Sequence, residues 1–146
     1  MQVEIKIDST VTEPKVVILT DQINEEINEI FRKLSDTESQ MIAGFQNDTV
    51  TLLDQDTILR IYAANGKVFA ATEKGEYLIR LRLYELDARL RRDRFVRISN
   101  SEIINLKKVR HFDLRFSGTI CVSLSDGTTT YISRRYVSKI KDLLGL

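Results

Sequence analysis

The residues best suited to bind a polar partner lie in one segment, FVRISNSEIINLKKV, at residues 95–109. Its apolar residues follow the pattern of short strands, yet Arg97, Asn100 and Lys107 stand among them. Arginine and asparagine side chains can each form two hydrogen bonds with a base edge in the major groove of DNA, and lysine pairs with phosphate. The segment therefore has the chemistry for recognising a polyanion.

Motifs that would indicate catalysis are absent from the sequence. There is no phosphate-binding glycine loop, no GxGxxG and no nucleophile elbow, and scattered carboxylates such as Asp54 and Asp56 are typical of caps and turns. One histidine, His111, and one cysteine, Cys121, cannot form a zinc cluster. Cys121 lies in the apolar pattern TICVSL and is predicted to be a small buried residue. We expect no enzymatic activity, metal, cofactor or small-molecule substrate.

The charge of the chain is distributed unevenly. Its net charge is +1, but residues 1–57 carry 12 acidic and 4 basic side chains, a net of −8. Residues 58–146 carry 18 basic and 9 acidic side chains, a net of +9. A basic half favours a polyanionic partner, because each phosphate that it neutralises releases counterions. A solvated surface would have the same composition, so the placement of the polar residues must decide between the two.

Several of these polar residues occur where a predicted strand or helix meets a loop. Lys67 follows a hairpin glycine, and Asn100 and Ser101 interrupt a strand pattern. Arg134 and Arg135 begin the last predicted helix. Taken singly, each has a simpler explanation: asparagine forms turns, a hairpin lysine is solvated, and arginines pair with carboxylates. Together they are consistent with a binding surface held by rigid elements.

The N-terminal part is predicted to form a small βαβ-like module. Alternation predicts a strand at 3–8, and the apolar run VVILT after the only proline predicts another at 16–20. The isoleucines of DQINEEINEIFRKLSD recur at helical spacing, with Asp21 as the expected cap. The remainder reads as an antiparallel β domain with a short internal helix. Its predicted elements are strands at 40–46, 49–54, 57–64, 67–72 and 76–81, a helix near 81–90, strands at 95–105, 111–117, 119–125 and 129–133, and a closing helix capped by Ser133.

The order of these motifs resembles the LytTR DNA-binding domain of bacterial response regulators. The resemblance spans about residues 57–144. A leucine-patterned helix precedes an F-x-R-x-x-x-S-x-I-x-N segment, and S-R-R leads into the last helix. The matching residues are Phe95, Arg97, Ser101, Ile103, Asn105 and Ser133 to Arg135.

The resemblance implies a fold whose loops, in place of a recognition helix, enter successive major grooves. The positions that the family uses for base contacts fall on Lys67, Asn100 and Arg135. The resemblance implies nearby backbone or supporting contacts from a second group, namely Arg97, Ser101, Lys107, Lys108 and Arg134. Double-stranded DNA is the partner that this resemblance predicts, bound by a homodimer that reads paired repeats.

Residues 1–56 are too few for the receiver domain that most LytTR regulators carry. The whole chain resembles the short LytTR regulators that have a small N-terminal extension and are encoded beside a small membrane protein that antagonises them. We therefore expect an α+β protein in which residues 1–56 serve dimerisation or partner docking and residues 57–146 bind DNA. No signal peptide or membrane span appears in the sequence, so the expected location is the cytoplasm.

Two other functions remain open from the sequence. One is binding of single-stranded nucleic acid, which would need aromatic side chains exposed on a sheet for base stacking. The candidate aromatics are Tyr62, Phe69, Tyr77, Phe112, Phe116 and Tyr131. The other is a protein interaction adaptor with no nucleic-acid partner.

Overall fold

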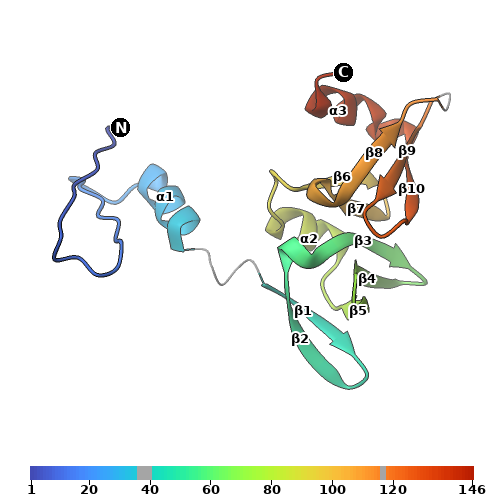
Figure 1. Ribbon diagram of the computed structural model, residues 1–146, viewed down its shortest axis with the longest axis horizontal. Coiled ribbons are helices and arrows are strands. Elements are labelled where there is room, and N and C mark those ends of the chain that lie inside the picture. Colours follow the sequence, from blue (N-terminus) through green and yellow to red (C-terminus); the bar gives the residue numbers. More distant parts are fainter. Residues whose placement is uncertain (36–40, 116–117) are drawn as a thin grey trace. The chain divides into compact units, whose positions relative to one another are not determined.

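The chain forms two compact units, Met1–Asp36 and Thr37–Leu146, in a computed structural model that describes residues 1–35, 41–115 and 118–146. Its described elements are mixed α and β, with mostly antiparallel strands (Figure 1). The expected α+β class is confirmed. Since the second unit begins at Thr37, it includes the hairpin at 41–54 that the sequence analysis grouped with the N-terminal extension.

The first unit contains one helix, α1 (Glu25–Ser35), and none of its described residues forms a strand. The strands predicted at 3–8 and 16–20 are therefore wrong: these segments have the apolar residues of strands, but no described neighbouring strand pairs with them. The helix is capped by Asn24, not by Asp21, because Asn24 Oδ1 accepts a hydrogen bond from the Ile27 N–H at 3.0 Å. Glu25 and Glu26 occupy the first turn, where negative charge is favourable.

The second unit is built on a seven-stranded antiparallel sheet of strand order β2-β1-β5-β4-β3-β7-β6. Its strands are β1 (Met41–Gln46), β2 (Thr49–Asp54), β3 (Ile58–Ala64), β4 (Lys67–Thr72), β5 (Gly75–Ile79), β6 (Phe95–Ser99) and β7 (Glu102–Asn105). Turn residues fix the hairpins: Asn47 and Asp48 join β1 to β2, and Asn65 and Gly66 join β3 to β4, all four at positive φ. The strands predicted in this region are confirmed.

A smaller sheet and two helices complete the second unit. The sheet has the order β10-β9-β8, with β8 (Val109–Asp113), β9 (Ile120–Leu124) and β10 (Thr129–Ile132). The helices are α2 (Leu83–Arg89) and α3 (Arg134–Leu144), and short 3₁₀ turns lie at Gln55–Thr57 and Leu106–Lys108. Of the strand predicted at 111–117, residues 111–113 belong to β8, and residues 116 and 117 lie outside the described residues. Figure 1 shows the β1–β2 hairpin and α3 at opposite ends of this unit.

Two hydrophobic cores lie on the two faces of the large sheet. The first joins the sheet to α2 and includes Ile61, Leu86 and Ile103. The second joins the sheet to β9, β10 and α3 and includes Ile104 and Ile140. Neighbouring residues of β7 thus enter opposite cores, as the alternation of side chains along a strand requires. The two cores hold the loops of both sheets in a fixed relation.

Candidate nucleic-acid interface

Three loops of the second unit meet at one edge of the fold. They are the β3–β4 turn, the β6–β7 turn at Asn100 and Ser101, and the start of α3. The first two are joined by the Ala63 N–H, which donates to the Ser101 carbonyl at 2.8 Å. The second and third are joined by the Ser133 N–H, which donates to the Ile98 carbonyl at 2.9 Å. We call these three loops the loop edge.

Arg97 holds the β6–β7 turn in shape. Its Nε donates to the Ser99 carbonyl at 2.9 Å, and its Nη2 donates to the Asn100 carbonyl at 2.6 Å. The Ser101 N–H also donates to Ser99 Oγ at 3.2 Å. Hydrogen bonds from a charged donor are the stronger kind, so Arg97 restricts the turn that carries Asn100. The Arg97 guanidinium is therefore partly occupied by two backbone carbonyls of the protein.

Asn100 is exposed at the tip of this turn, and its side chain has one protein partner among the described residues. The Tyr136 hydroxyl, on the first turn of α3, donates to Asn100 Oδ1 at 3.2 Å. The Nδ2 donors and one lone pair of Oδ1 stay available, which is the set that pairs with adenine N7 and N6. Tyr136 was missed by the sequence analysis, because 36 residues separate it from Asn100 and no local pattern links them.

The other two predicted base-contact residues are exposed at the same edge. Lys67 begins β4 directly after the hairpin turn, and Arg135 lies in the first turn of α3. Neither side chain forms a hydrogen bond or ion pair with any residue that the structure describes. Arg134 is also exposed and passes close to Gly118, where an added Cβ would lie 3.1 Å from Arg134 Nε. The loop edge thus carries Lys67, Asn100, Arg134 and Arg135 together.

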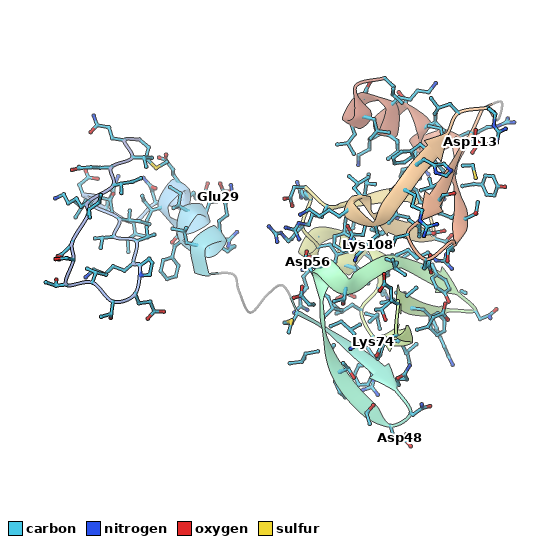
Figure 2. The ribbon with its side chains drawn as sticks, viewed as in Figure 1. Glu29, Asp48, Asp56, Lys74, Lys108 and Asp113 are labelled. Atoms are coloured by element: carbon cyan, nitrogen blue, oxygen red, sulfur yellow. The ribbon has the colours of Figure 1, made fainter. Side chains whose placement is uncertain are left out.

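Lys107 and Lys108 lie at the other end of β7, in the 3₁₀ turn Leu106–Lys108, and are not part of the loop edge. Lys108, labelled in Figure 2, is held by its backbone, whose carbonyl accepts a hydrogen bond from the Ser125 N–H at 2.7 Å. Asn105 of the motif is buried at 1% exposure; its Nδ2 donates to the Ile58 carbonyl at 2.8 Å and its Oδ1 accepts from the Lys107 N–H at 3.0 Å. Asn105 therefore has a structural role.

One arginine that follows strand β8 is neutralised within the protein. Arg115 forms a two-pronged ion pair with Asp113, with its Nη2 at 2.6 Å from Oδ2 and its Nε at 3.0 Å from Oδ1. Hydrogen bonds from Arg115 lower the pKa of the Asp113 carboxyl to about 2. The pKa of Arg115 is raised, because the same hydrogen bonds favour its charged form. The net charge available for DNA is smaller than a count of basic residues indicates.

The aromatic residues of the large sheet are engaged with other side chains. The Tyr62 and Phe69 rings stack with centroids 5.5 Å apart, and the Arg60 guanidinium lies 4.3 Å from the Tyr62 centroid. The Tyr62 hydroxyl donates to Glu76 Oε1 at 2.6 Å, and burial together with this bond raises the pKa of Tyr62. Arg60 is also paired with Glu102 at 3.1 Å. This side of the sheet is a connected polar network.

The remaining aromatic candidates do not form a stacking surface with this pair. Tyr77 is buried in the first core, and Phe112 packs against the second. Tyr131 is half exposed on β10, in the other sheet, while Phe116 lies outside the described residues. A base would have to displace Arg60 to reach the Tyr62 ring on the face that it covers. This arrangement gives no support to binding of single strands by stacking.

In the described parts of the chain, no group of three or more His, Cys, Asp and Glu residues is placed to hold a metal ion. No helix in those parts is long and apolar enough to span a membrane. Cys121 is buried, as predicted.

Comparison with known proteins identifies the family of this chain. Residues 48–145 match the family model of the LytTr DNA-binding domain. Uncharacterized HTH-type transcriptional regulators of Staphylococcus aureus strains NCTC 8325 and COL are each 29% identical over 147 residues, covering 100% of this chain and 99% of theirs.

A solved LytTr DNA-binding domain from Bacillus cereus superposes with a TM-score of 0.71 at 20% identity, covering 73% of this chain and 98% of that one. Its likeness shows the fold. Although the staphylococcal names describe a helix-turn-helix type, no two of the described helices here follow one another without intervening strands. The family is one of transcription regulators, not of enzymes, and the chain belongs to the LytTR DNA-binding domain family.

Proposed function

We propose that this LytTR transcription regulator reads double-stranded DNA through the loop edge, with Lys67, Asn100 and Arg135 against base edges. Arg134 and Ser101 lie beside them and are placed to contact phosphate. One observation carries the proposal: three loops far apart in sequence are joined by backbone hydrogen bonds at one edge, and their polar side chains are exposed. Arginine suits guanine and asparagine suits adenine, so each loop can specify a base.

Because Lys107 and Lys108 lie away from the loop edge, we propose a role for them that differs from that of the base-reading residues. A lysine that contacts phosphate acts as a point charge, and contacts with phosphate carry no sequence information. These two side chains would contact a more distant part of the DNA backbone. Arg97 is proposed to act through the turn that it holds, by fixing Asn100.

The test is a pair of substitutions measured on an operator first found by footprinting the promoter of the protein's own gene. Asn100→Ala and Arg135→Ala should each cost about 1–3 kcal/mol on the preferred duplex and relax the preference for one base. Lys107→Ala, the matched control, should weaken all duplexes alike. Retention of full discrimination by both folded variants would contradict the base-reading proposal. Thermal melting checks folding, and competition with single strands separates the duplex reading from the single-stranded one.

We further propose that the working form is a homodimer in the bacterial cytoplasm and that a protein partner, namely a small membrane protein, sets its activity. Two linked sites raise affinity for paired repeats beyond that of one small domain. Residues 1–57, with their net charge of −8, are repelled by DNA and suited to face a protein. A partner that prefers the DNA-free form lowers occupancy by its differential affinity.

Crosslinking in cells tests the partner. A membrane protein should be recovered with the full-length chain, and its gene, when deleted, should change expression of the target promoter. Unchanged expression after deletion of each neighbouring membrane-protein gene would contradict this part of the proposal. The DNA-reading part would be unaffected, because it is measured with purified protein.

A further inference from the structure

The β1–β2 hairpin is apolar on both of its faces. Ile42 and Leu53 are paired across the strands and buried in the first core. On the opposite face the pairs Ala43–Leu52 and Phe45–Val50 are apolar as well. An antiparallel hairpin with one face in water normally alternates apolar and polar residues, and strands apolar on both faces are normally covered on both. This outer face, however, is open: Leu52 is 64% exposed and Val50 is 59% exposed.

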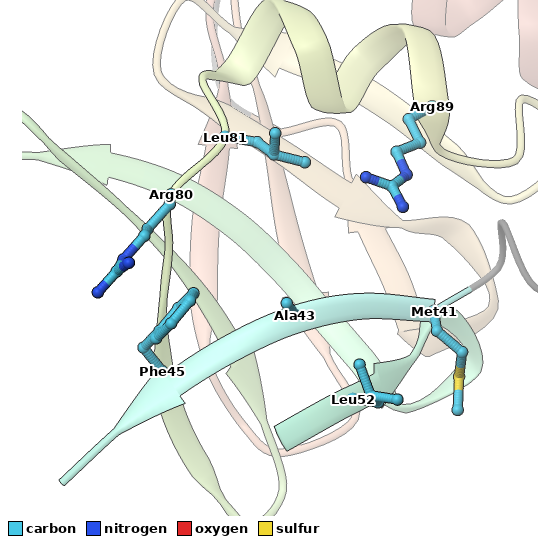
Figure 3. Close-up of a pocket in the computed structure, with 7 residues that line it drawn as sticks. All are labelled: Met41, Ala43, Phe45, Leu52, Arg80, Leu81 and Arg89. Atoms are coloured by element: carbon cyan, nitrogen blue, oxygen red, sulfur yellow. The ribbon is translucent and has the colours of Figure 1, made fainter. Parts of the chain in front are cut away.

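The outer face forms a groove with arginines along it. Figure 3 shows Met41, Ala43 and Phe45 on β1, Leu52 on β2 below them, and Arg80 and Arg89 on the side opposite the hairpin. The Arg80 guanidinium lies 4.0 Å from the centroid of the Phe45 ring. An occupant of this groove must therefore be apolar toward the strands and acidic toward the arginines.

The chain itself contains a segment with these two properties. The α1 helix places Ile27, Ile30 and Leu34 on one side, at spacings of three and four residues; Ile27 and Ile30 are half-buried in the single chain, and Leu34 is 54% exposed. Its exposed acidic residues lie at the start and on the flank of the same helix. They are Glu25, Glu26 and Glu29, the last of which is labelled in Figure 2.

We propose that the groove on β1–β2 binds the α1 helix of a second copy of this chain. If the grooves of two copies packed against each other around a twofold axis, their arginines would lie close together and repel. The α1 helix instead brings carboxylates to the arginines. Five residues, 36–40, connect α1 to Met41, which lines the groove itself. Exchange of an element between identical copies is a low-cost route to a dimer, and docking of α1 on its own chain is the alternative that disulfide trapping distinguishes.

The exchange gives a closed dimer. Each copy contributes one helix and receives one helix, so both open apolar surfaces are covered and none is left to recruit further copies. The contact does not involve the loop edge. It deepens the homodimer part of the proposed function, on which it rests, and it is independent of base reading because it requires no DNA.

Disulfide trapping between full-length chains tests the proposal. A tagged chain with Leu34→Cys is mixed with an untagged chain carrying Leu52→Cys and oxidised, with buried Cys121 present in every chain as background. We expect a mixed tagged–untagged dimer, and no dimer from either variant alone. Replacing Leu52→Cys by Leu143→Cys, an equally exposed leucine on α3 outside the groove, should abolish the mixed dimer.

Three outcomes would overturn the proposal. Dimers formed by Leu52→Cys alone would indicate groove-to-groove packing. An internal disulfide in the Leu34→Cys/Leu52→Cys double variant, with no mixed dimer from the single variants, would indicate docking within one chain. A chain that sediments as a monomer at high concentration would exclude the dimer altogether.

Sedimentation of charge variants gives a second readout. Leu52→Lys should raise the dimer Kd at least tenfold while melting at the wild-type temperature, since Leu52 is exposed in the single chain. Leu143→Lys should leave the Kd unchanged. Equal Kd values for the two variants would count against the groove.

Discussion

Tyr136→Phe should reduce discrimination at one base of the operator without unfolding the protein. The substitution removes the hydroxyl that donates to Asn100 Oδ1 and keeps the ring, which packs against the second core. The donor–acceptor distance of 3.2 Å is longer than the usual 2.7–2.8 Å of hydroxyl hydrogen bonds, so the bond belongs to the weaker part of the usual range. We expect a loss of about 0.5–1 kcal/mol, or roughly two- to fivefold in affinity.

The assay is fluorescence anisotropy on two duplexes, the preferred operator and one altered at the base whose preference Asn100→Ala abolishes. Tyr136→Phe should weaken the first and leave the second nearly unchanged. In the Asn100→Ala background it should have no further effect, because the hydroxyl acts through that amide. Tyr84→Phe is the matched control, because the Tyr84 side chain is exposed on α2. Equal losses on both duplexes, or an undiminished loss in the Asn100→Ala background, would refute the reasoning.

Three further outcomes are expected. If each protomer neutralises on the order of four to six phosphates, log affinity should fall with log salt with a slope of about −4 to −5, and a flat response would exclude phosphate contacts. The pKa of Tyr62 should lie above the usual tyrosine value of 10.0; its contribution to stability is complete below pH 10 and is lost as pH rises through the folded pKa. Absorbance titration against Tyr62→Phe measures this, and a normal pKa would contradict it. A chain starting at Thr57 should melt lower than one starting at Thr37, because burial of Ile42 and Leu53 contributes about 1.5–3 kcal/mol each; equal melting would show that the hairpin is dispensable.

The strands of the second unit were predictable because short-range signals determine them. Asn65-Gly66 favours a tight hairpin, and residues at positive φ occupy the turns that the sequence marks. The segments at 3–8 and 16–20 have the alternating or continuous apolar residues of strands, but no described strand pairs with them. Alternation alone is therefore insufficient, since a strand is stable only when its backbone groups are paired.

The candidate site was predictable in its exposed residues and not in its supporting ones. The family resemblance indicated Lys67, Asn100 and Arg135, and all three are exposed where a strand or helix of this chain meets a loop. Asn105 was identified only as a matching residue of the family motif; in the structure its amide donates to the carbonyl of Ile58, 47 residues away. Contacts over such separations depend on the assembled sheet and leave no trace in local spacing.

The clamp formed by Arg97 has a consequence for which molecule adapts when protein and DNA meet. Its two hydrogen bonds fix the β6–β7 turn before binding, and the bonds from Ala63 and Ser133 fasten the neighbouring loops to the same strands. Little ordering entropy is then left to be lost by the protein on association. Any mismatch in shape must be taken up by bending or twisting of the double helix. Operators of such a pre-shaped reader would be selected for deformable steps between the contacted bases as well as for the bases themselves.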